Sequence, residues 1–170
     1  MNIENKTVLV TGSTDGVGRL VARRLADQGA RVLIHGRDRT RGEQLLKEIR
    51  DANRGSAAFL PADFSLLAEV RRLANTVRQE CERLDILINN AGVGSGGSAG
   101  KRETSQNGHE LRFAVNYLAG FLNLAVADEL DGTSGHFYNG LRPSKANPQA
   151  YDDTARGRLR VLSLQLTGLA

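Results

Sequence analysis

The 170-residue sequence predicts an α/β fold with a parallel β-sheet, on two observations. Through the first two-thirds of the chain, short apolar runs rich in β-branched residues alternate with amphipathic stretches of helical length. Strands and helices that alternate in this way imply right-handed βαβ units, in which the strands lie parallel. The second observation is composition: 40% of the residues are hydrophobic, which is enough for one core, and the 25% that are charged are mixed in sign.

The predicted strands and helices alternate without a break through the first half of the chain. Short apolar runs that end in glycine or polar residues predict strands, and apolar residues three and four positions apart predict helices. The predicted strands cover residues 7–12, 31–36, 56–63 and 84–90, and the helices between them cover residues 18–29, 41–53 and 65–84. Residues 92–108, rich in glycine, predict a loop over a site, with a linker between domains as the alternative. A last helix is predicted within residues 147–170, with one apolar stripe of Leu159, Leu162, Leu166 and Leu169.

Charge and cysteine content argue against several classes of function. The formal net charge is +4, and the arginines are scattered over amphipathic stretches, so we predict no nucleic-acid partner. Cys81 is the one cysteine, which excludes an intramolecular disulfide, and it is interpreted as a buried thiol. No apolar run approaches the length of a membrane span, and the N-terminus lacks the pattern of a signal peptide. We therefore predict a cytoplasmic protein with no membrane contact and no metal site.

The segment VTGSTDGVGRL carries the first candidate site, in the turn between the first strand and the first helix. Gly12, Gly16 and Gly18 allow a tight turn, a close approach of the backbone to a pyrophosphate, and close packing of the helix on the strand. The amino end of the helix then offers unpaired N–H groups and a partial positive charge to phosphates. Glycines also mark ordinary turns, but the strand before and the helix after favour a nucleotide site.

The end of the second strand, LIHGRDRTR, bears on which nicotinamide cofactor would bind. A carboxylate at this place would hold the ribose 2′-hydroxyl of NAD, and an arginine would bind the 2′-phosphate of NADP. Gly36 leaves room, and Arg37 is suited to bidentate, charge-assisted hydrogen bonds with a phosphate, so NADP is predicted. Asp38 keeps NAD open as one alternative, and Arg37 as an ordinary solvated charge is the other.

Four motifs in this order, TGSTDGVG, ADFS, NNAG and HELRFAVNYLAGF, resemble the short-chain dehydrogenase/reductase family, the last of them its retinol-dehydrogenase-like branch. The resemblance covers roughly Lys6 to Leu122, and linked motifs are far more specific than any one of them. It implies a Rossmann-like, doubly wound sheet and an NAD(P)-dependent oxidoreductase that acts on alcohols or carbonyls. For the four predicted strands, the general scheme of such sheets gives the order 3-2-1-4, with flanking helices.

Carried over position by position, the resemblance implies roles for residues at the ends of the strands. Around the pyrophosphate and the adenosine ribose it places Gly12, Ser13, Asp15, Gly16, Val17 and Gly18. Asp63 and Phe64 would meet the adenine, and Asn89 would brace the central sheet. The residues that would line the rest of the cofactor are Asn90, Ala91, Gly92 and, on the nicotinamide side, Val115. Asn116 would be the catalytic asparagine, which holds a water in a proton relay.

The sequence lacks the other catalytic residues that the family uses. Those are a serine after the fifth strand and a tyrosine and lysine spaced Y-x-x-x-K, in which the lysine lowers the tyrosine pKa for proton transfer near neutral pH. The three tyrosines, Tyr117, Tyr138 and Tyr151, are followed four residues later by Phe121, Arg142 and Ala155. We therefore expect impaired hydride transfer. The alternative is a working oxidoreductase that uses Asn116, Tyr138 and Lys145 as substitutes.

The segment around Leu122 and Asn123 resembles a junction between two separated parts of the family's chain. FAVNYLAGFL passes straight to NLAVADELDGTSGHFYNGLR, which resembles the family's late region, so we expect an internal deletion; simple divergence is the alternative. A dinucleotide-binding half, residues 1–122, would then precede a C-terminal loop and helix, residues 123–170, packed on the same domain. The fourth strand would form a bare apolar edge, which favours self-association or marginal stability. A non-enzymatic module that binds a second copy or another partner is the remaining functional interpretation.

Overall fold

The structure, a computed structural model, describes residues 2–94, 102–120, 138–139, 142–143 and 151–169. The chain divides into two compact units, Met1–Leu124 and Ala125–Ala170. None of the helices in the described ranges is long and apolar enough to cross a membrane. The functional division at residue 122, and the packing of the second part on the first, stay predictions.

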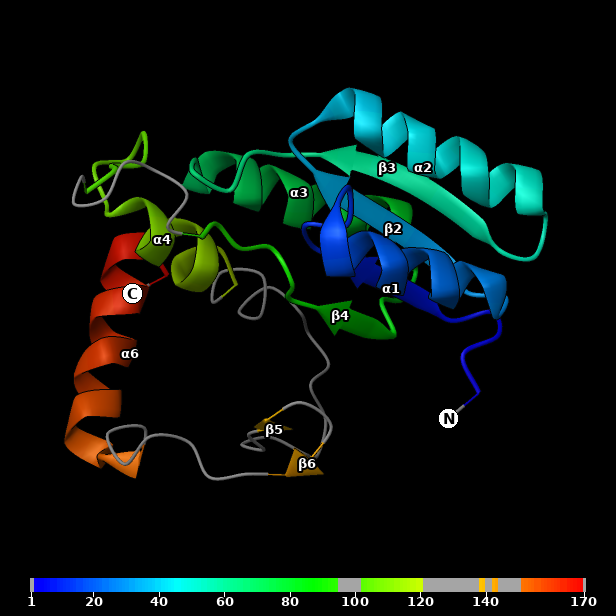
Figure 1. Cartoon of the computed structure of the whole chain (residues 1–170). Helices are drawn as coiled ribbons and strands as arrows, with labels where there is room; N and C mark the ends of the chain where they lie inside the picture. The colour runs from blue at the N-terminus through cyan, green and yellow to red at the C-terminus, as the bar shows by residue number, and fades with distance from the viewer. Residues whose placement is uncertain (1, 95–101, 121–137, 140–141, 144–150, 170) are drawn as a thin grey trace. The chain divides into compact units, whose positions relative to one another are not determined.

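The first unit contains a four-stranded parallel sheet (Figure 1). Its strands are β1 (Thr7–Val10), β2 (Arg31–Gly36), β3 (Ser56–Pro61) and β4 (Ile86–Ile88), in the order β3-β2-β1-β4. The α/β class and the predicted order 3-2-1-4 are confirmed. β1 pairs with both β2 and β4, so Leu9 lies in register with Leu33 on one side and Leu87 on the other.

β4 is shorter than the predicted strand at both ends, because the polar residues of the run bind β1 in other ways. The Asp85 carboxylate accepts a hydrogen bond from the Thr7 amide at 2.9 Å. At the other end the Asn90 side-chain amide donates to the Thr11 carbonyl oxygen at 3.0 Å. These side chains fix the start and the end of the strand, and only Ile86–Ile88 remain in the ladder.

Three helices connect the strands: α1 (Gly16–Asp27), α2 (Arg39–Ala52) and α3 (Leu67–Glu80). Two of them begin after an aspartate cap. The Asp15 carboxylate accepts from the Gly16 amide at 2.8 Å, and the Asp38 carboxylate accepts from the Arg41 amide at 3.1 Å. An N-terminal cap of this kind satisfies a helix amide that has no partner inside the helix. The caps explain why α1 and α2 each begin two residues before the predicted starts.

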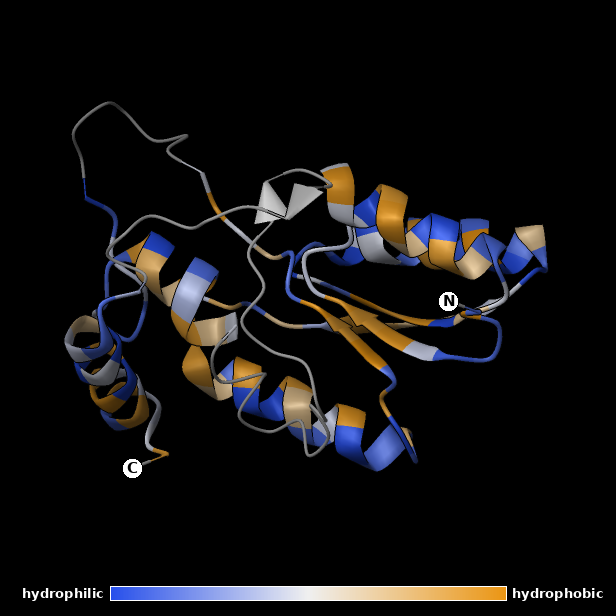
Figure 2. Cartoon of the chain, turned by 90° about the horizontal axis from the view of Figure 1, so that it is seen from below, coloured by the Kyte–Doolittle hydropathy of each residue, from blue (hydrophilic) through white to orange (hydrophobic). Residues whose placement is uncertain are grey.

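The core lies in two layers, one on each face of the sheet (Figure 2). Side chains alternate along a strand, so the odd and even positions of β1 and β2 face opposite layers. One cluster joins alternate strand residues to α1 and α2, and its members include Val8, Val10, Ala22, Ala26, Val32, Ile34, Leu45 and Ile49. On the other side Leu9 and Leu33 are buried, and α3 buries Leu67, Val70, Leu73, Ala74 and Val77.

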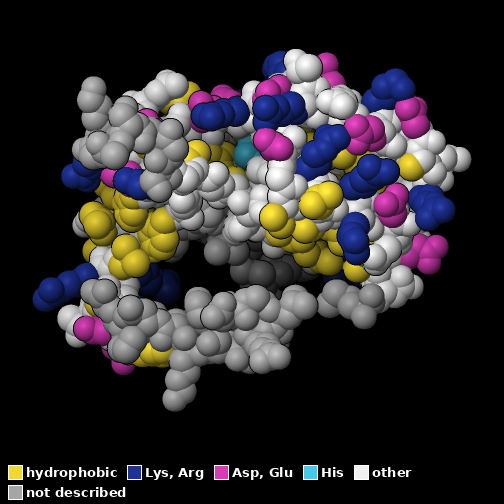
Figure 3. All heavy atoms as spheres, in the orientation of Figure 1, with side chains coloured by type: hydrophobic (Ala, Val, Ile, Leu, Met, Phe, Trp, Pro, Cys, Tyr) yellow, Lys and Arg dark blue, Asp and Glu magenta, His cyan; other side chains and the backbone are white. Residues whose placement is uncertain are grey.

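The residues of α1 that are fully buried are small. The buried residues are Gly18, Ala22 and Ala26, whereas Leu20 is 64% exposed. Small residues let a helix approach the preceding strand and turn closely. Val21 and Leu25 pack, partly buried, against the same core, and among the apolar side chains of α1 only Val17 and Leu20 lie exposed. Figure 3 shows charged side chains of both signs interspersed around α1 and α2, which agrees with the scattered arginines of the sequence.

A short α-helix, α4 (Leu111–Phe113), continues directly into a π-helical turn, η1 (Ala114–Leu118). Both elements lie within the motif HELRFAVNYLAGF. Ala114, Val115 and Leu118 are buried, whereas Asn116 lies on the exposed side. A π-helical turn is rare and occurs often at functional sites, because it redirects one or two side chains.

The second unit contains a small antiparallel pair, β5 (Tyr138–Asn139) with β6 (Arg142–Pro143), and the helix α6 (Asp153–Thr167). The predicted C-terminal helix is therefore present, with Asp152 as its cap. Its buried side chains are Ser163 and Thr167, whereas Leu159 and Leu162 of the predicted apolar stripe are exposed. The Ser163 and Thr167 hydroxyls donate to the Leu159 and Ser163 carbonyl oxygens, both at 2.7 Å.

Candidate functional site

The candidate site lies at the carboxyl edge of the sheet, where the segments after β1, β2, β3 and β4 come together. In an open sheet of this type, ligands bind outside the carboxyl ends of the strands. Most of the residues that the resemblance singles out belong to these four segments. The last two, Val115 and Asn116, lie in η1.

The turn after β1 contains three glycines with different structural roles. Gly12 has φ +64°, and a Cβ there would lie 2.7 Å from the Ala91 Cα. A Cβ at Gly18 would collide with the Gly12 carbonyl oxygen and the Asn90 side chain. Gly16 has φ +53°, and a Cβ there would meet nothing within 4 Å. Gly12 and Gly18 therefore close the turn on its neighbours, whereas Gly16 borders open space at the start of α1, where a phosphate would lie.

Asn90 and Thr11 fasten the segment after β4 to this turn. The Asn90 side-chain amide donates to the carbonyl oxygens of Thr11 and Gly12, each at 3.0 Å. The Thr11 hydroxyl oxygen accepts from the amides of Asn90 and Ala91, at 2.9 and 3.0 Å. Asn90 thus braces the end of the sheet, and the exposed Asn89 lies near Gly120. The bracing role expected of Asn89 stays a prediction.

The end of β2 presents a charged cluster that the sequence revealed only in part. Asp38 caps α2, and its carboxylate also lies 3.3 Å from Arg41 Nε. Arg41 Nη1 forms a second ion pair with Asp15 Oδ2 at 2.5 Å. The Asp38 carboxylate is therefore already engaged, and Arg41 joins Arg37 as a cation at this corner. A basic residue three positions after a helix cap is the signal that could have identified Arg41.

The space beside Gly36 differs from the sequence expectation. A Cβ at Gly36 would lie 2.5 Å from the side chain of Thr14. The glycine therefore makes room for the β1–α1 turn to lie against the end of β2. It brings the turn and Arg37 together, and does not itself leave a vacant place for a ligand.

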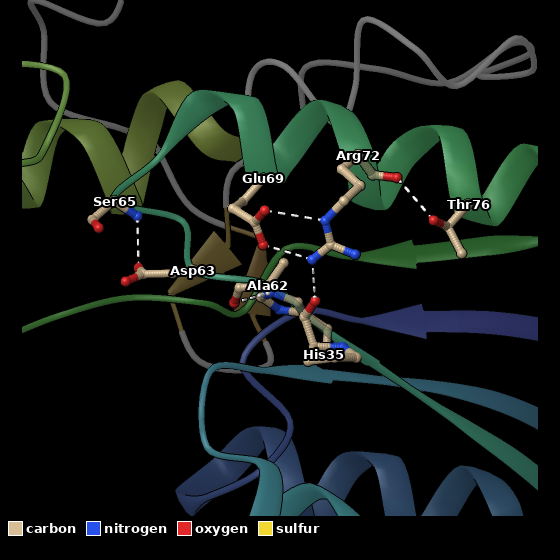
Figure 4. A network of polar contacts seen from close by, with 8 residues as sticks. His35, Ala62, Asp63, Ser65, Glu69, Arg72 and Thr76 are labelled. Atoms are coloured by element: carbon tan, nitrogen blue, oxygen red, sulfur yellow. Dashed lines mark hydrogen bonds and ion pairs between the residues drawn. The ribbon is translucent and has the colours of Figure 1, made fainter.

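The segment after β3 contains Asp63 and Phe64. The Asp63 carboxylate accepts from the Ser65 amide at 2.9 Å (Figure 4). The Phe64 side chain is only 4% exposed, and its ring stacks on His35 with centroids 4.1 Å apart. The Phe64 ring is thus engaged inside the protein, so an adenine would meet the backbone of this residue and the side chain of Asp63.

His35 is a buried residue of the site that sequence reasoning missed. It is 3% exposed, and burial lowers its pKa to about 4, against smaller opposing effects of the Ala62 carbonyl and Asp63. Nearby, Ser13 is buried and its hydroxyl oxygen accepts from the His35 amide at 2.9 Å. A polar residue inside the otherwise apolar run VLIHG was the available signal.

Asn116 is held against the segment after β4. Its side-chain oxygen accepts from the Val93 amide at 2.8 Å, and its side-chain nitrogen donates to the Val93 carbonyl oxygen at 3.1 Å. A Cβ at Gly92 would lie 3.5 Å from Asn116 Oδ1. The neighbouring Val115 is buried. Asn116 therefore fixes the path of the chain past Gly92.

The structure does not bring a substitute catalytic group together in the residues it describes. The Tyr117 ring stacks on Phe113 with centroids 5.3 Å apart, and Tyr138 lies in β5. Lys145 and its neighbour Ser144 lie outside the described residues. Within the described ranges, no group of three His, Cys, Asp or Glu residues is placed to hold a metal ion.

Comparison with known proteins finds a matching family model, related proteins and related solved structures. The family model described as short chain dehydrogenase matches residues 6–136. A protein of Streptomyces sp. (strain C5) assigned as a daunorubicin C-13 ketoreductase is 42% identical over 121 residues, which are 71% of this chain and 40% of that protein. Retinol dehydrogenase 14 of Mus musculus is 36% identical over 131 residues, which are 71% of this chain and 38% of that protein. The chain thus spans about two-fifths of the length of these relatives.

A solved structure matches over a similar share of the chain. A metagenomic short-chain oxidoreductase in complex with NADP aligns with a TM-score of 0.65 and 31% identity, covering 75% of this chain and 57% of that one.

Proposed function

The chain belongs to the short-chain dehydrogenase family of oxidoreductases, and we propose that its first unit binds NADP(H) while its 170 residues transfer hydride poorly. The predicted family, with retinol dehydrogenases among its relatives, is confirmed. The observation that carries the proposal is the glycine turn, in which Gly12 and Gly18 pack on their neighbours and Gly16 borders open space at the amino end of α1. A phosphate bound there would replace the Asp15 carboxylate as the acceptor for the Gly16 amide. The residues proposed to surround the pyrophosphate and ribose are Gly12, Ser13, Asp15, Gly16, Val17 and Gly18.

The remaining cofactor contacts follow the strand ends. Asp63 and the backbone of Phe64 are proposed to hold the adenine. The rest of the cofactor would run past Asn90, Ala91, Gly92 and Val115. Bound NADPH would supply the hydride, and Asn116 is the one family catalytic residue that the chain retains in the described part.

The choice of NADP over NAD rests on the charges at the end of β2. The Asp38 carboxylate accepts from the Arg41 amide and pairs with the Arg41 guanidinium, so it is poorly placed to hold a ribose hydroxyl. Arg37 follows Gly36 at the same corner and would bind a 2′-phosphate. The matched oxidoreductase in complex with NADP supports this choice.

The poor hydride transfer rests on chemistry absent from the sequence. No tyrosine in the 170 residues has a lysine four positions later. Without that pair, proton transfer to a developing alkoxide would lack the usual acid near neutral pH. An internal deletion near Leu122 and Asn123 is our interpretation of this absence.

Binding is tested by titrating the protein into NADPH and following the fluorescence of the cofactor, with NADH as competitor. We expect saturable binding that favours NADPH. Arg37→Ala should raise the dissociation constant for NADPH by about tenfold to a hundredfold, because charge-assisted hydrogen bonds to the 2′-phosphate are lost. The dissociation constant for NADH should stay nearly unchanged, because NADH has no 2′-phosphate. Arg50→Ala removes the same charge from the far end of α2 and is the matched control. Equal binding of the two cofactors would contradict the role of Arg37.

Catalysis is tested separately by NADPH oxidation with a panel of aldehydes and ketones. We expect turnover no faster than the background without protein. Turnover that Tyr138→Phe abolishes would overturn the proposal of impaired catalysis, and would favour the substitute set of Asn116, Tyr138 and Lys145.

A second candidate function, self-association without catalysis, is favoured by the position of β4. Among the described strands β4 pairs only with β1, and its three apolar residues are each only partly buried. An apolar edge strand is a template for pairing with another chain. Sedimentation velocity at rising protein concentration should then give larger species with or without NADPH. Leu87→Lys should abolish them and Leu162→Lys, on α6, should not; a monomer at every concentration would exclude this function.

A further inference from the structure

The His35 ring lies between two segments of the candidate site and makes a different hydrogen bond to each. Nδ1 is 3.0 Å from the Gly12 amide nitrogen, which can only donate. Nδ1 must therefore be the unprotonated acceptor, and the proton lies on Nε2. Nε2 in turn lies 3.2 Å from the Ala62 carbonyl oxygen, which can only accept. The two backbone partners thus select one neutral tautomer.

The two partners belong to the two parts of the site that are proposed to hold the pyrophosphate and the adenine. Gly12 opens the turn proposed to hold the pyrophosphate, and Ala62 directly precedes the proposed adenine contacts, Asp63 and Phe64. The Phe64 ring is stacked on the imidazole. His35 is therefore fixed on two edges and one face, and a displacement of either segment would break a hydrogen bond to the ring.

The far side of the Ala62 segment is anchored to α3 (Figure 4). Arg72 Nη2 donates to the Pro61 carbonyl oxygen at 2.7 Å, and the same guanidinium pairs with Glu69 at 2.6 Å. The β3–α3 segment is thus held by Arg72 on one side and by His35 on the other. The backbone of β2 also bonds to each segment: the Ser13 amide donates to the His35 carbonyl oxygen at 2.8 Å, and the Ala62 amide donates to the Gly36 carbonyl oxygen at 3.3 Å. The His35 ring is a side chain that bonds to both segments at once.

We propose that His35 is a positioning residue, which sets the spacing between the pyrophosphate turn and the adenine segment and so prepares both to bind one dinucleotide. The proposal rests on the proposed binding of NADP(H). Its physical basis is preorganisation: a ligand that spans both segments gains when their spacing is already correct, whereas a ligand that touches one segment gains little.

Protonation of the ring should undo this arrangement. A second proton on Nδ1 would face the Gly12 N–H, donor against donor. The charged groups in the elements around the ring are Asp63 after β3, the Glu69–Arg72 pair of α3, and Asp15 and Arg37 near the turn and the end of β2. Burial lowers the pKa of His35 to about 4, so the ring stays neutral at physiological pH.

The test compares two ligands of different reach on the same variants. NADP⁺ carries the pyrophosphate that the glycine turn is proposed to hold, whereas 2′-AMP carries the adenine, the ribose and the 2′-phosphate without it. His35→Phe, which keeps an aromatic ring without either hydrogen bond, should raise the dissociation constant for NADP⁺ about tenfold and that for 2′-AMP less than about threefold. His35→Asn, whose side-chain oxygen can replace Nδ1 as acceptor for Gly12, should recover part of the loss. His109→Phe makes the same change on a half-buried histidine elsewhere and is the control.

The pH dependence of ligand binding distinguishes this proposal from a purely structural role of His35, which would not change the relative affinity for the two ligands with pH. Both ligands carry the same 2′-phosphate, so its titration cancels in the ratio of their dissociation constants. In the wild type, the dissociation constant for NADP⁺ divided by that for 2′-AMP should rise below about pH 5, as His35 takes up a proton. In His35→Phe this ratio should not change with pH. Equal losses for both ligands, or a ratio independent of pH in the wild type, would overturn the proposal.

Nitrogen-15 NMR of the imidazole separates this inference from the proposed function. The ring should show an unprotonated Nδ1 and a protonated Nε2 at neutral pH, and His35→Phe should speed hydrogen exchange at the Gly12 amide and shift the Ala62 resonances. If these hold but neither ligand binds, the proposed function fails and the link between the two segments stands. A proton on Nδ1, or an undisturbed Ala62, refutes the link whatever binds.

Discussion

Helices α2 and α6 begin and end by the same means, yet they bury opposite kinds of side chain. They have 14 and 15 residues, and each begins after an aspartate cap, Asp38 or Asp152. Each ends at a residue in the left-handed conformation, Asn53 with φ 49° and Gly168 with φ 66°. Local sequence therefore specifies both helices equally well.

The difference lies in the faces of the two helices. α2 buries Gly42, Leu45 and Ile49 in the core of the first unit. α6 fully buries only Ser163 and Thr167, while Leu159 and Leu162 are 39% and 45% exposed. The comparison teaches that caps decide where a helix begins and ends, whereas the elements packed against it decide which face is buried.

The largest expected contrast comes from shortening one leucine in each helix. Leu45 is 0% exposed, so Leu45→Ala should lower the free energy of unfolding by about 2–5 kcal/mol, through lost burial and a cavity. Leu162→Ala should lower it by less than about 1 kcal/mol, because the side chain is already largely in water. Urea unfolding, followed by amide signals of each helix, measures both losses. A loss at Leu162 as large as that at Leu45 would mean that the α6 stripe is covered in solution.

The next largest difference between the two units should be their sensitivity to acid, because the buried His35 belongs to the first unit. Its pKa is lowered from 6.5 to about 4 in the folded protein. Between these two pH values, His35 is therefore protonated in the unfolded chain and neutral in the folded one. Stability is therefore complete above pH 6.5 and declines as the pH falls to about 4, by about 3 kcal/mol in all. The decline should appear in the unfolding of α2 and not in signals of α6.

His35→Asn is the control for the effect of acid. It should lower stability at neutral pH and flatten the dependence between these two pH values. An unchanged slope in this variant would assign the acid sensitivity to other groups.

The smallest contrast uses one glycine in the interior of each helix. A Cβ at Gly42 would collide with the Phe59 ring, so Gly42→Ala should destabilise by about 1 kcal/mol, after the gain in helix propensity is subtracted. At Gly157 a Cβ would meet nothing within 4 Å, so Gly157→Ala should stabilise α6 by about 0.5–1 kcal/mol. Thermal unfolding should show a lower melting temperature for Gly42→Ala and a higher one for Gly157→Ala. A gain at both positions would show that Phe59 moves aside at little cost.

The candidate site divides between what the motifs revealed and what they could not. The glycine turn and the NNAG segment were identifiable because their residue types have one main use in this context, a close approach of backbone to backbone or to a phosphate. His35 and Arg41 each had a local signal, but their roles depend on partners 23 and 26 residues away in sequence, Gly12 and Asp15. No local pattern records such a contact.

The sequence by itself determined the alternation of strands and helices, with the parallel direction that this alternation implies, and the position of the glycine turn. Those features follow from periodicity, caps and glycines, which act over a few residues. Only the tertiary structure decided that Thr14 packs against Gly36, that the Phe64 ring stacks on His35 and that Arg41 pairs with Asp38. It also decided that α6 leaves Leu159 and Leu162 exposed. The physical reason is that burial and pairing depend on which distant segments come together, and a chain shows this only once it is folded.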